Sequence, residues 1–230
     1  MAPKHVAIIL DGNRRFAKKQ GINPLKGHEH GAKRLIDVLE WLKELGVKEV
    51  TFYTLSTENL KRTGVEVAAL MALFRKGLDE EKKDGRIDSN GAKVRFIGRL
   101  GLLPKDIQKG MAELMERTKN HSNYTVNFAI AYGGKAEIVD AVRKIVAAAK
   151  KGSINEEDID EKTFPDYLYM ADEPELLIRP GGEKRISNFL LWQLAYSEFI
   201  FLDKLWPEIT RQDLVDCIAE YEKRARRVGK

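Results

Sequence analysis

The 230-residue sequence contains a single cysteine, Cys217. One cysteine excludes a disulfide framework within the chain and any metal site built from several thiolates. Long apolar runs are also absent, and the stretch 6–10, for example, is only a handful of residues. A membrane-spanning helix needs about 20 apolar residues, and the core of a signal peptide about 7–15 behind a basic start. We therefore expect a soluble, cytoplasmic protein.

Positively and negatively charged residues nearly balance. Lys and Arg number 40 against 35 Asp and Glu, a net charge of +5, and most basic residues are interleaved with acids, as in residues 79–84. Mixed runs of this kind form solvated helix faces rather than a stripe that follows a phosphate backbone. Neither G-x-x-x-x-G-K-[ST] nor G-x-G-x-x-G occurs. The sequence therefore argues against nucleic acid as a partner and gives no support for nucleotide binding.

Linkers, internal repeats and low-complexity tracts are missing as well, so we expect one domain over residues 1–230. Short apolar runs alternate with longer segments of helical period, the pattern of an α/β domain with a mainly parallel sheet. The predicted strands cover residues 5–10, 50–55, 94–97, 125–131, 176–178 and 199–202. The predicted helices cover residues 35–45, 67–84, 104–120, 136–150 and 188–196, with a final helix after 210. Ser187 is expected to cap the helix 188–196, Asn155 a short acidic helix, and Thr210 the final one.

Dense polar groups follow three of these strands, in the loops 11–15, 56–62 and 179–188. In open α/β sheets, ligands bind outside the carboxyl ends of the strands. Glycine lets the backbone approach a ligand closely, and the guanidinium fork of arginine fits phosphate oxygens in pairs. The arginines of these loops indicate more than one phosphate group. A lone carboxylate among them, Asp11, is then best explained by Mg²⁺ bridging to phosphate.

Two blocks of sequence, residues 5–17 and 179–193, closely resemble the cis-prenyltransferases, above all the undecaprenyl diphosphate synthases and their dolichol-type relatives. The resemblance extends over about residues 5–229. It implies a parallel sheet of about six strands flanked by helices, with an apolar tunnel, in a chain that forms a homodimer. It also implies an activity: isopentenyl diphosphate units are added to an allylic diphosphate, each with a cis double bond and release of diphosphate. The product would be a long-chain polyprenyl diphosphate, the precursor of a carrier lipid for glycan assembly.

The resemblance also assigns roles to single residues. Asp11 matches the aspartate that holds Mg²⁺ and assists departure of the allylic diphosphate, and Glu198 matches a second Mg²⁺ ligand at or near the dimer contact. Asn59 matches a residue that takes part in removing a proton; an amide is a poor base, so we expect it to act through a phosphate oxygen or water. The allylic diphosphate would be held by Gly12, Asn13, Arg14, Arg15, His28 and Arg62, and the isopentenyl diphosphate by Arg179, Arg185 and Ser187. Neighbouring positions expected to complete the substrate site are Phe16, Ser56, Thr57, Glu58, Leu60 and Ile186.

Four positions depart from the pattern of the bacterial enzymes. Pro24 stands where an arginine is common, Phe16 and Leu60 where tryptophan is common, and Lys184 where histidine is frequent. These changes affect the allylic site most, so farnesyl and geranylgeranyl diphosphate both stay open as the starter; the pattern is similar to that of enzymes that favour the longer one. Near the C-terminus, residues 227–229 resemble an R-x-G element that can close the site of a partner subunit, with a plain basic tail as the alternative.

A growing prenyl chain needs an apolar channel. The apolar face of one predicted helix supplies candidates for its wall, although the same face could be ordinary core: Val67, Leu70, Met71, Phe74 and Leu78. A lipophilic product makes transient peripheral contact with a membrane expected at delivery. Three other interpretations remain: a synthase that stops after one or two additions, a non-catalytic partner subunit, and a basic nucleic-acid binder.

Overall fold

The computed structural model describes residues 1–61 and 64–224. Within them, one sheet of six parallel strands has the order β3-β4-β2-β1-β5-β6. The strands are β1 (His5–Ile9), β2 (Glu49–Ser56), β3 (Ala92–Ile97), β4 (Tyr124–Tyr132), β5 (Leu176–Arg179) and β6 (Glu198–Phe201). The predicted α/β class and the parallel sheet are therefore confirmed. Every residue of β1 is buried, as expected of a central strand covered on both faces.

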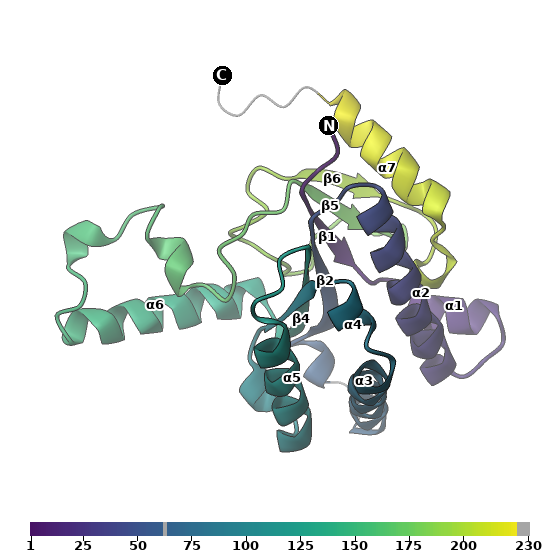
Figure 1. The fold of residues 1–230 in the computed structure, drawn as a ribbon, viewed down its shortest axis with the longest axis horizontal. Coiled ribbons are helices and arrows are strands. Elements are labelled where there is room, and N and C mark those ends of the chain that lie inside the picture. Colours follow the sequence, from purple (N-terminus) through teal and green to yellow (C-terminus); the bar gives the residue numbers. More distant parts are fainter. Residues whose placement is uncertain (62–63, 225–230) are drawn as a thin grey trace.

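Helices flank the sheet on both sides (Figure 1). They are α1 (Asn13–Lys19), α2 (Pro24–Glu44), α3 (Gly64–Asp84), α4 (Arg86–Ser89), α5 (Lys105–Thr118), α6 (Gly134–Lys150) and α7 (Arg211–Lys223). The period of the buried residues explains why they pack: α5 buries Ile107, Met111 and Leu114, which recur every three or four positions. None of the helices in the described ranges is long and apolar enough to cross a membrane.

The two faces of the sheet bury different clusters, because successive strand residues point to opposite sides. One face packs Ile8 and Phe52 against Leu42 of α2 and Leu214 of α7. On the other face, Ala7, Ile9 and Tyr53 of the sheet pack against the segment that contains Phe189 and Leu190. A third cluster lies between the end of β2 and helices α3 and α5. Leu55, just before the polar loop that follows β2, belongs to this third cluster, and Leu60, within that loop, packs against it.

Helix α1 lies against the start of α2, and two glycines of α2 make the close approach possible. A Cβ atom on Gly27 would lie 2.2 Å from the carbonyl oxygen of Asn13, and one on Gly31 would lie 2.1 Å from its Oδ1. No side chain fits at either position without separating the helices. Asn13 is thereby held between the two helices, next to the arginines that follow it in α1.

Several predictions about local structure are wrong. The segment 188–196 forms turns rather than a helix, because Ser187, Asn188 and Leu190 have φ angles of 50°, 65° and 43°, in the left-handed region. The cap expected at Ser187 is wrong as well, since no helix follows it, and part of the loop predicted over 11–15 is the start of helix α1.

By contrast, the cap expected at Thr210 is confirmed, because Thr210 and Asp213 form a capping box. Asn155 precedes a short 3-10 helix and its backbone N–H donates to Asp158, but its side chain makes no capping bond.

Candidate active site

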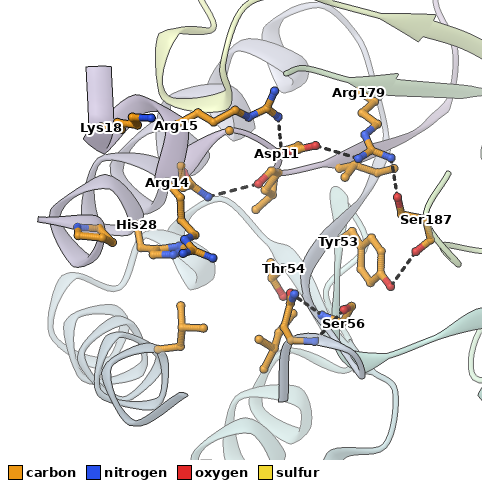
Figure 2. A pocket seen from close by; sticks show the side chains of 18 of the residues that line it. Asp11, Arg14, Arg15, Lys18, His28, Tyr53, Thr54, Ser56, Arg179 and Ser187 are labelled. Atoms are coloured by element: carbon orange, nitrogen blue, oxygen red, sulfur yellow. Dashed lines mark hydrogen bonds and ion pairs between the residues drawn. The ribbon is translucent and has the colours of Figure 1, made fainter. Parts of the chain in front are cut away.

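A cavity of about 730 Å³ lies beyond the carboxyl ends of β1, β2 and β5. Adjacent strands bring three loops to this edge, as expected of an open α/β sheet. Helix α1 and the start of α2 close the side next to β1 (Figure 2). The predicted site residues that line the cavity are Asp11, Gly12, Asn13, Arg14, Arg15, His28, Ser56, Asn59, Arg179 and Ser187.

Asp11 stands between two arginines at the centre of this cavity. Arg15 donates from Nη2 to Oδ1 of Asp11 at 2.9 Å, and Arg179 donates from Nη2 to Oδ2 at 2.8 Å. The Arg179 side chain is only 4% exposed, whereas that of Asp11 is 26% exposed. Two guanidinium groups thus share one carboxylate, and the cluster keeps a positive charge that favours an anionic ligand.

Arg179 also organises the loop that follows β5. Its Nη1 donates to the hydroxyl of Ser187 at 2.8 Å and to the carbonyl oxygen of Arg185. Figure 2 shows a continuous chain of contacts from Arg15 through Asp11 and Arg179 to Ser187. One buried arginine therefore connects the loops after β1 and β5.

Gly181 makes this arrangement possible. Its φ angle is 96°, and a Cβ atom there would lie 2.6 Å from Nη2 of Arg15 and 3.3 Å from Cγ of Asp11. The carbonyl oxygen of Gly181 accepts a hydrogen bond from Arg15. Only glycine combines this backbone conformation with the space that the arginine occupies.

In the loop after β2, Ser56 and Asn59 hold each other. The backbone N–H of Ser56 donates to Oδ1 of Asn59 at 3.2 Å, and the backbone N–H of Asn59 donates to Oγ of Ser56 at 3.1 Å. Such reciprocal side-chain to backbone bonds stabilise a tight turn. The amide of Asn59 therefore has a fixed orientation at the cavity wall.

Several predicted site residues do not line the cavity. Phe16 packs against the ring of His30 at a centroid distance of 5.2 Å, and Leu60 packs into the third apolar cluster. Ile186 is partly buried against the cluster of Phe189. Arg185 is 63% exposed and pairs with Glu183 at 2.6 Å.

Thr57 and Glu58 lie just outside the cavity, near the start of α6. The Oγ1 of Thr57 faces Gly133, and Glu58 accepts a hydrogen bond from Asn188 at 3.1 Å. Arg62 and the R-x-G element at 227–229 lie outside the described residues. Lys184 is exposed.

Glu198 is distant from Asp11 within one chain. The strand register places Glu198 beside Leu176, and Leu176 beside Val6 of β1. Asp11 is five residues further along, which corresponds to about 16 Å at 3.3 Å per residue. Glu198 instead pairs with Arg224 at 2.7 Å. The structure does not bring the two predicted metal ligands together in a single copy.

The donor set of the cavity fits a hard cation only in company with phosphate. Within residues 1–61 and 64–224, no three or more His, Cys, Asp or Glu side chains gather as a metal site. Among the described lining residues, Asp11 is the one acid. Mg²⁺ is commonly bound by one or two carboxylates together with substrate phosphates and water. Asp11 therefore fits Mg²⁺ when a diphosphate supplies further oxygens.

Sequence reasoning missed several lining residues, among them Tyr53, Thr54, Leu55 and Lys18. Lys18 follows Arg15 and Arg14 by three and four positions, so a predicted helix α1 would have placed it on their face. Pro24, noted only as a departure, also lines the cavity, as do Ile9, Leu10 and Ile22.

Tyr53 supports the wall opposite α1. Its ring stacks on Phe189 at a centroid distance of 4.5 Å, and its hydroxyl lies 3.3 Å from the carbonyl oxygens of Tyr132 and Ser187. Burial raises the pKa of Tyr53 far above its usual value, so its hydroxyl stays protonated and donates. Successive strand residues point to opposite faces of the sheet, which gives the side on which Tyr53 points. Its partner could not be predicted in this way, because Phe189 is remote in sequence.

Leu55 and Leu70 are among the apolar residues that line the cavity. Of the five predicted channel residues, Leu70 alone lines the cavity. The others pack in the third apolar cluster behind it: Val67, Met71, Phe74 and Leu78. A channel along α3 stays a prediction.

Comparison with known proteins identifies the family. The family model described as "Putative undecaprenyl diphosphate synthase" matches residues 9–229. Two curated archaeal relatives carry the name tritrans,polycis-undecaprenyl-diphosphate synthase (geranylgeranyl-diphosphate specific). That of Thermococcus kodakarensis is 47% identical, with 99% of this chain and 87% of the relative covered. That of Methanocaldococcus jannaschii is 48% identical, with 99% and 83% covered.

Solved structures agree with the sequence comparison. Lavandulyl diphosphate synthase from Lavandula x intermedia, crystallised with dimethylallyl diphosphate, superposes with a TM-score of 0.95 at 36% identity. The match covers 100% of this chain and 99% of the other. Fold, cavity and comparisons together show that this chain belongs to the cis-prenyltransferase (undecaprenyl diphosphate synthase) family of transferases.

Proposed function

We propose that this enzyme adds isopentenyl diphosphate units to geranylgeranyl diphosphate and makes tritrans,polycis-undecaprenyl diphosphate. The observation that carries the proposal is the position of Asp11 between Arg15 and Arg179, in a cavity that is also lined by apolar residues such as Leu55 and Leu70. The names of the archaeal relatives support geranylgeranyl diphosphate as the starter. The departures at Phe16, Pro24 and Leu60 are in accord with that choice.

Two diphosphates would occupy the two sides of Asp11. The allylic diphosphate would bind the residues after β1, with Arg14, Arg15 and His28 as its contacts on α1 and α2 and with Arg62. The isopentenyl diphosphate would bind Arg179 and Ser187, joined by Arg185 from the exposed part of the same loop. Each charge-assisted hydrogen bond from arginine to phosphate contributes roughly 1.5–3 kcal/mol.

Each addition requires three changes in bonding. The C1–O bond of the allylic substrate breaks and its diphosphate leaves with the electron pair, the terminal carbon of isopentenyl diphosphate bonds to C1, and a proton leaves C2 of the isopentenyl unit. Arg15 and Arg179 hold the Asp11 carboxylate in place and offset the charge that develops on the leaving group. When bound, Mg²⁺ would be held by Asp11 together with diphosphate oxygens and would supply further charge neutralisation.

Asn59 is in a position to orient the step that removes the proton. Its side chain is fixed at the cavity wall by Ser56, but an amide does not accept a proton at neutral pH. The proton would therefore pass to an oxygen of the diphosphate or to water, with Asn59 orienting that acceptor.

The growing chain would leave the polar mouth past Leu55 and Leu70 and enter the apolar region against α3. At about 0.8 kcal/mol per buried methylene, each five-carbon unit gains several kcal/mol of affinity for such surroundings. The same affinity favours transient contact of the enzyme with a membrane when the product is released, and we expect the enzyme to act in the cytoplasm.

A homodimer is part of the proposal. Helix α6 extends away from the body of the molecule (Figure 1). Its residues Val139, Val142 and Val146 recur at helical spacing, and each is 47–48% exposed. Exposure of a stripe of apolar side chains to water is unfavourable in free energy. A second copy of the same helix would cover the stripe. Glu198 could act as a second metal ligand at Asp11 only if it came from such a partner.

The test is incubation with labelled isopentenyl diphosphate, Mg²⁺ and a choice of farnesyl or geranylgeranyl diphosphate, followed by chromatography of the products. We expect preferential extension of geranylgeranyl diphosphate to long chains and loss of activity in Asp11→Ala. Products that stop after one or two additions would support a short-chain synthase instead. No extension by the wild-type protein would leave a non-catalytic partner subunit as the better account.

A further inference from the structure

The turn at residues 187–190 is held in an uncommon backbone conformation. Ser187, Asn188 and Leu190 have φ angles of 50°, 65° and 43°, which residues other than glycine rarely adopt. Such conformations persist only where the surroundings fix them. Because Ser187 lines the cavity, the contacts that fix this turn also fix the cavity wall.

Asn188 joins the turn to helix α6. Its Oδ1 accepts a hydrogen bond from the backbone N–H of Lys135 at 2.9 Å, and its carbonyl oxygen accepts one from the N–H of Gly134 at 2.7 Å. The N-cap residue of α6 is Gly133, which offers no side chain. Asn188 therefore caps α6 from a remote part of the sequence.

The other end of the same amide reaches the loop after β2. Its Nδ2 donates to Oε1 of Glu58 at 3.1 Å. The fit is tight, since a Cβ atom on Gly133 would lie 2.8 Å from Nδ2 of Asn188 and 2.8 Å from Oγ1 of Thr57. An asparagine is needed here because one end of the side chain accepts and the other donates.

We propose that Asn188 is a positioning residue that fixes Asn59 relative to the isopentenyl diphosphate subsite at Ser187. Its bond to Glu58 connects the residue after Ser187 to the residue before Asn59, and both Ser187 and Asn59 line the cavity. Asn188 is not among the described lining residues, so it acts through these neighbours. The inference rests on the proposed function, which assigns Ser187 to binding isopentenyl diphosphate and Asn59 to the removal of its proton.

Asn188→Asp distinguishes the hydrogen bond that the amide accepts from the one that it donates. The aspartate keeps an acceptor for the N–H of Lys135, so the cap of α6 remains, but it places a second carboxylate beside Glu58. Burial raises the pKa of Glu58, yet hydrogen bonds from its own N–H and from Ser56, Asn188 and Thr57 outweigh this and lower it, so Glu58 is ionised. Because Glu58 is exposed, water screens the repulsion between the two carboxylates, and we expect only a moderate effect. The rate of condensation should be about 10-fold slower than in the wild-type enzyme.

The experiment measures the single-turnover rate of condensation from preformed enzyme–substrate complexes, together with the stoichiometry of isopentenyl diphosphate binding by calorimetry. We expect Asn188→Asp to bind at full stoichiometry and to condense about 10-fold more slowly, since misalignment lowers the rate rather than the fraction of folded enzyme. Adding Glu58→Gln to that variant should bring the rate back to within about threefold of wild type, because the glutamine amide can donate to the aspartate. Raising the KCl concentration should reduce the difference in condensation rate between Asn188→Asp and wild type, because salt screens the repulsion between the two carboxylates.

Asn155→Asp, at the exposed residue before the short 3-10 helix that follows α6, is the matched control and should keep the wild-type rate. A wild-type rate in Asn188→Asp, or no recovery with Glu58→Gln, would overturn the inference. If Asn188→Asp does not fold, Glu58→Ala removes the acceptor and leaves the cap of α6; it should show the same slowing, and a wild-type rate in it would also overturn the inference. A wrong proposed function would appear separately, as absence of condensation by the wild-type protein.

Discussion

Arg179 and Asp11 form an ion pair of 2.8 Å in which the arginine is almost fully buried and the carboxylate faces the cavity. The same guanidinium donates to Ser187 through a different nitrogen. One side chain thus orients an acid and a hydroxyl on two loops at once, which requires a planar group with several fixed donors.

Arg179→Lys should therefore be severely impaired although it conserves the charge. A single ammonium cannot reach both partners with the geometry of the fork, and we expect kcat/KM for isopentenyl diphosphate to fall about 100-fold or more. Steady-state kinetics with the purified variant check this. Arg86→Lys, at a side chain that is 50% exposed on α4, is the control and should behave as wild type. A loss of less than about threefold in Arg179→Lys would contradict the assigned role.

Gly181→Ala should lose activity beyond its effect on stability. A positive φ at a residue other than glycine costs about 1–2 kcal/mol, and the new methyl group would also displace Arg15 from Asp11. Gly152→Ala is a matched control, because Gly152 has a φ of 70° and nothing within 4 Å of an added Cβ. Both variants should unfold at lower urea concentration, but only Gly181→Ala should lose about 10-fold or more in turnover. Equal activity in the two would show that the contact with Arg15 is unimportant.

His5 should make the fold sensitive to mild acid. Burial lowers the pKa of His5 to about 4, with opposing influences from Asp172, which raises it, and Arg95, which lowers it. In the unfolded chain His5 has its ordinary pKa near 6.5, so between pH 6.5 and pH 4 the unfolded chain binds a proton that the folded chain does not. The free energy of unfolding therefore falls as the pH falls through this window. From pH 7 to pH 5 the loss from this group is about 2 kcal/mol.

Urea unfolding of wild type and His5→Gln at the two pH values isolates the contribution of His5. The glutamine does not titrate, so the free energy of unfolding should depend less on pH in the variant by about 2 kcal/mol. Parallel pH dependence in the two proteins would mean that the histidine is not held neutral in the fold.

Val142→Glu should weaken self-association. The substitution places a charge in the middle of the exposed valine stripe of α6, and burying it against a partner would require desolvation. We expect sedimentation to report a dimer for wild type at micromolar concentration and a monomer for the variant. Val65→Glu, at an 83% exposed valine of α3, should remain dimeric. A dimer of unchanged affinity in Val142→Glu would place the interface elsewhere.

Strands and arginine loops were predictable because their signals are local. The run 5–10 is apolar without alternation and ends at Asp11, so both the central strand and the loop at its end follow from adjacent residues. Ser187 is of a residue type that caps helices, which contributed to the wrong prediction of a helix that begins at Asn188. Asn188 does cap a helix, but that helix is α6, whose first residues come some 50 positions earlier. Residue type predicts the bonding capacity of a side chain, whereas the tertiary fold selects its partner.

Glu198 illustrates the same limit at the level of the site. Its match to a family position says nothing about which edge of the sheet it occupies, and that is fixed only by the register of β6 on β5. Tyr53 lies in an apolar strand and gives no polar signal of its own. Its place at the cavity depends on the remote Phe189, against which it stacks.

The order of the sheet has a consequence for how products of different length can evolve. The three polar loops leave adjacent strands in the interior of the sheet, β2, β1 and β5, which are held by neighbours on both sides. The apolar residues of α3 and α5 lie off the sheet, in a separate cluster. With the proposed channel along α3, exchanges in that cluster would lengthen or shorten the lipid that is accommodated, while the chemistry that joins each unit would stay unaltered.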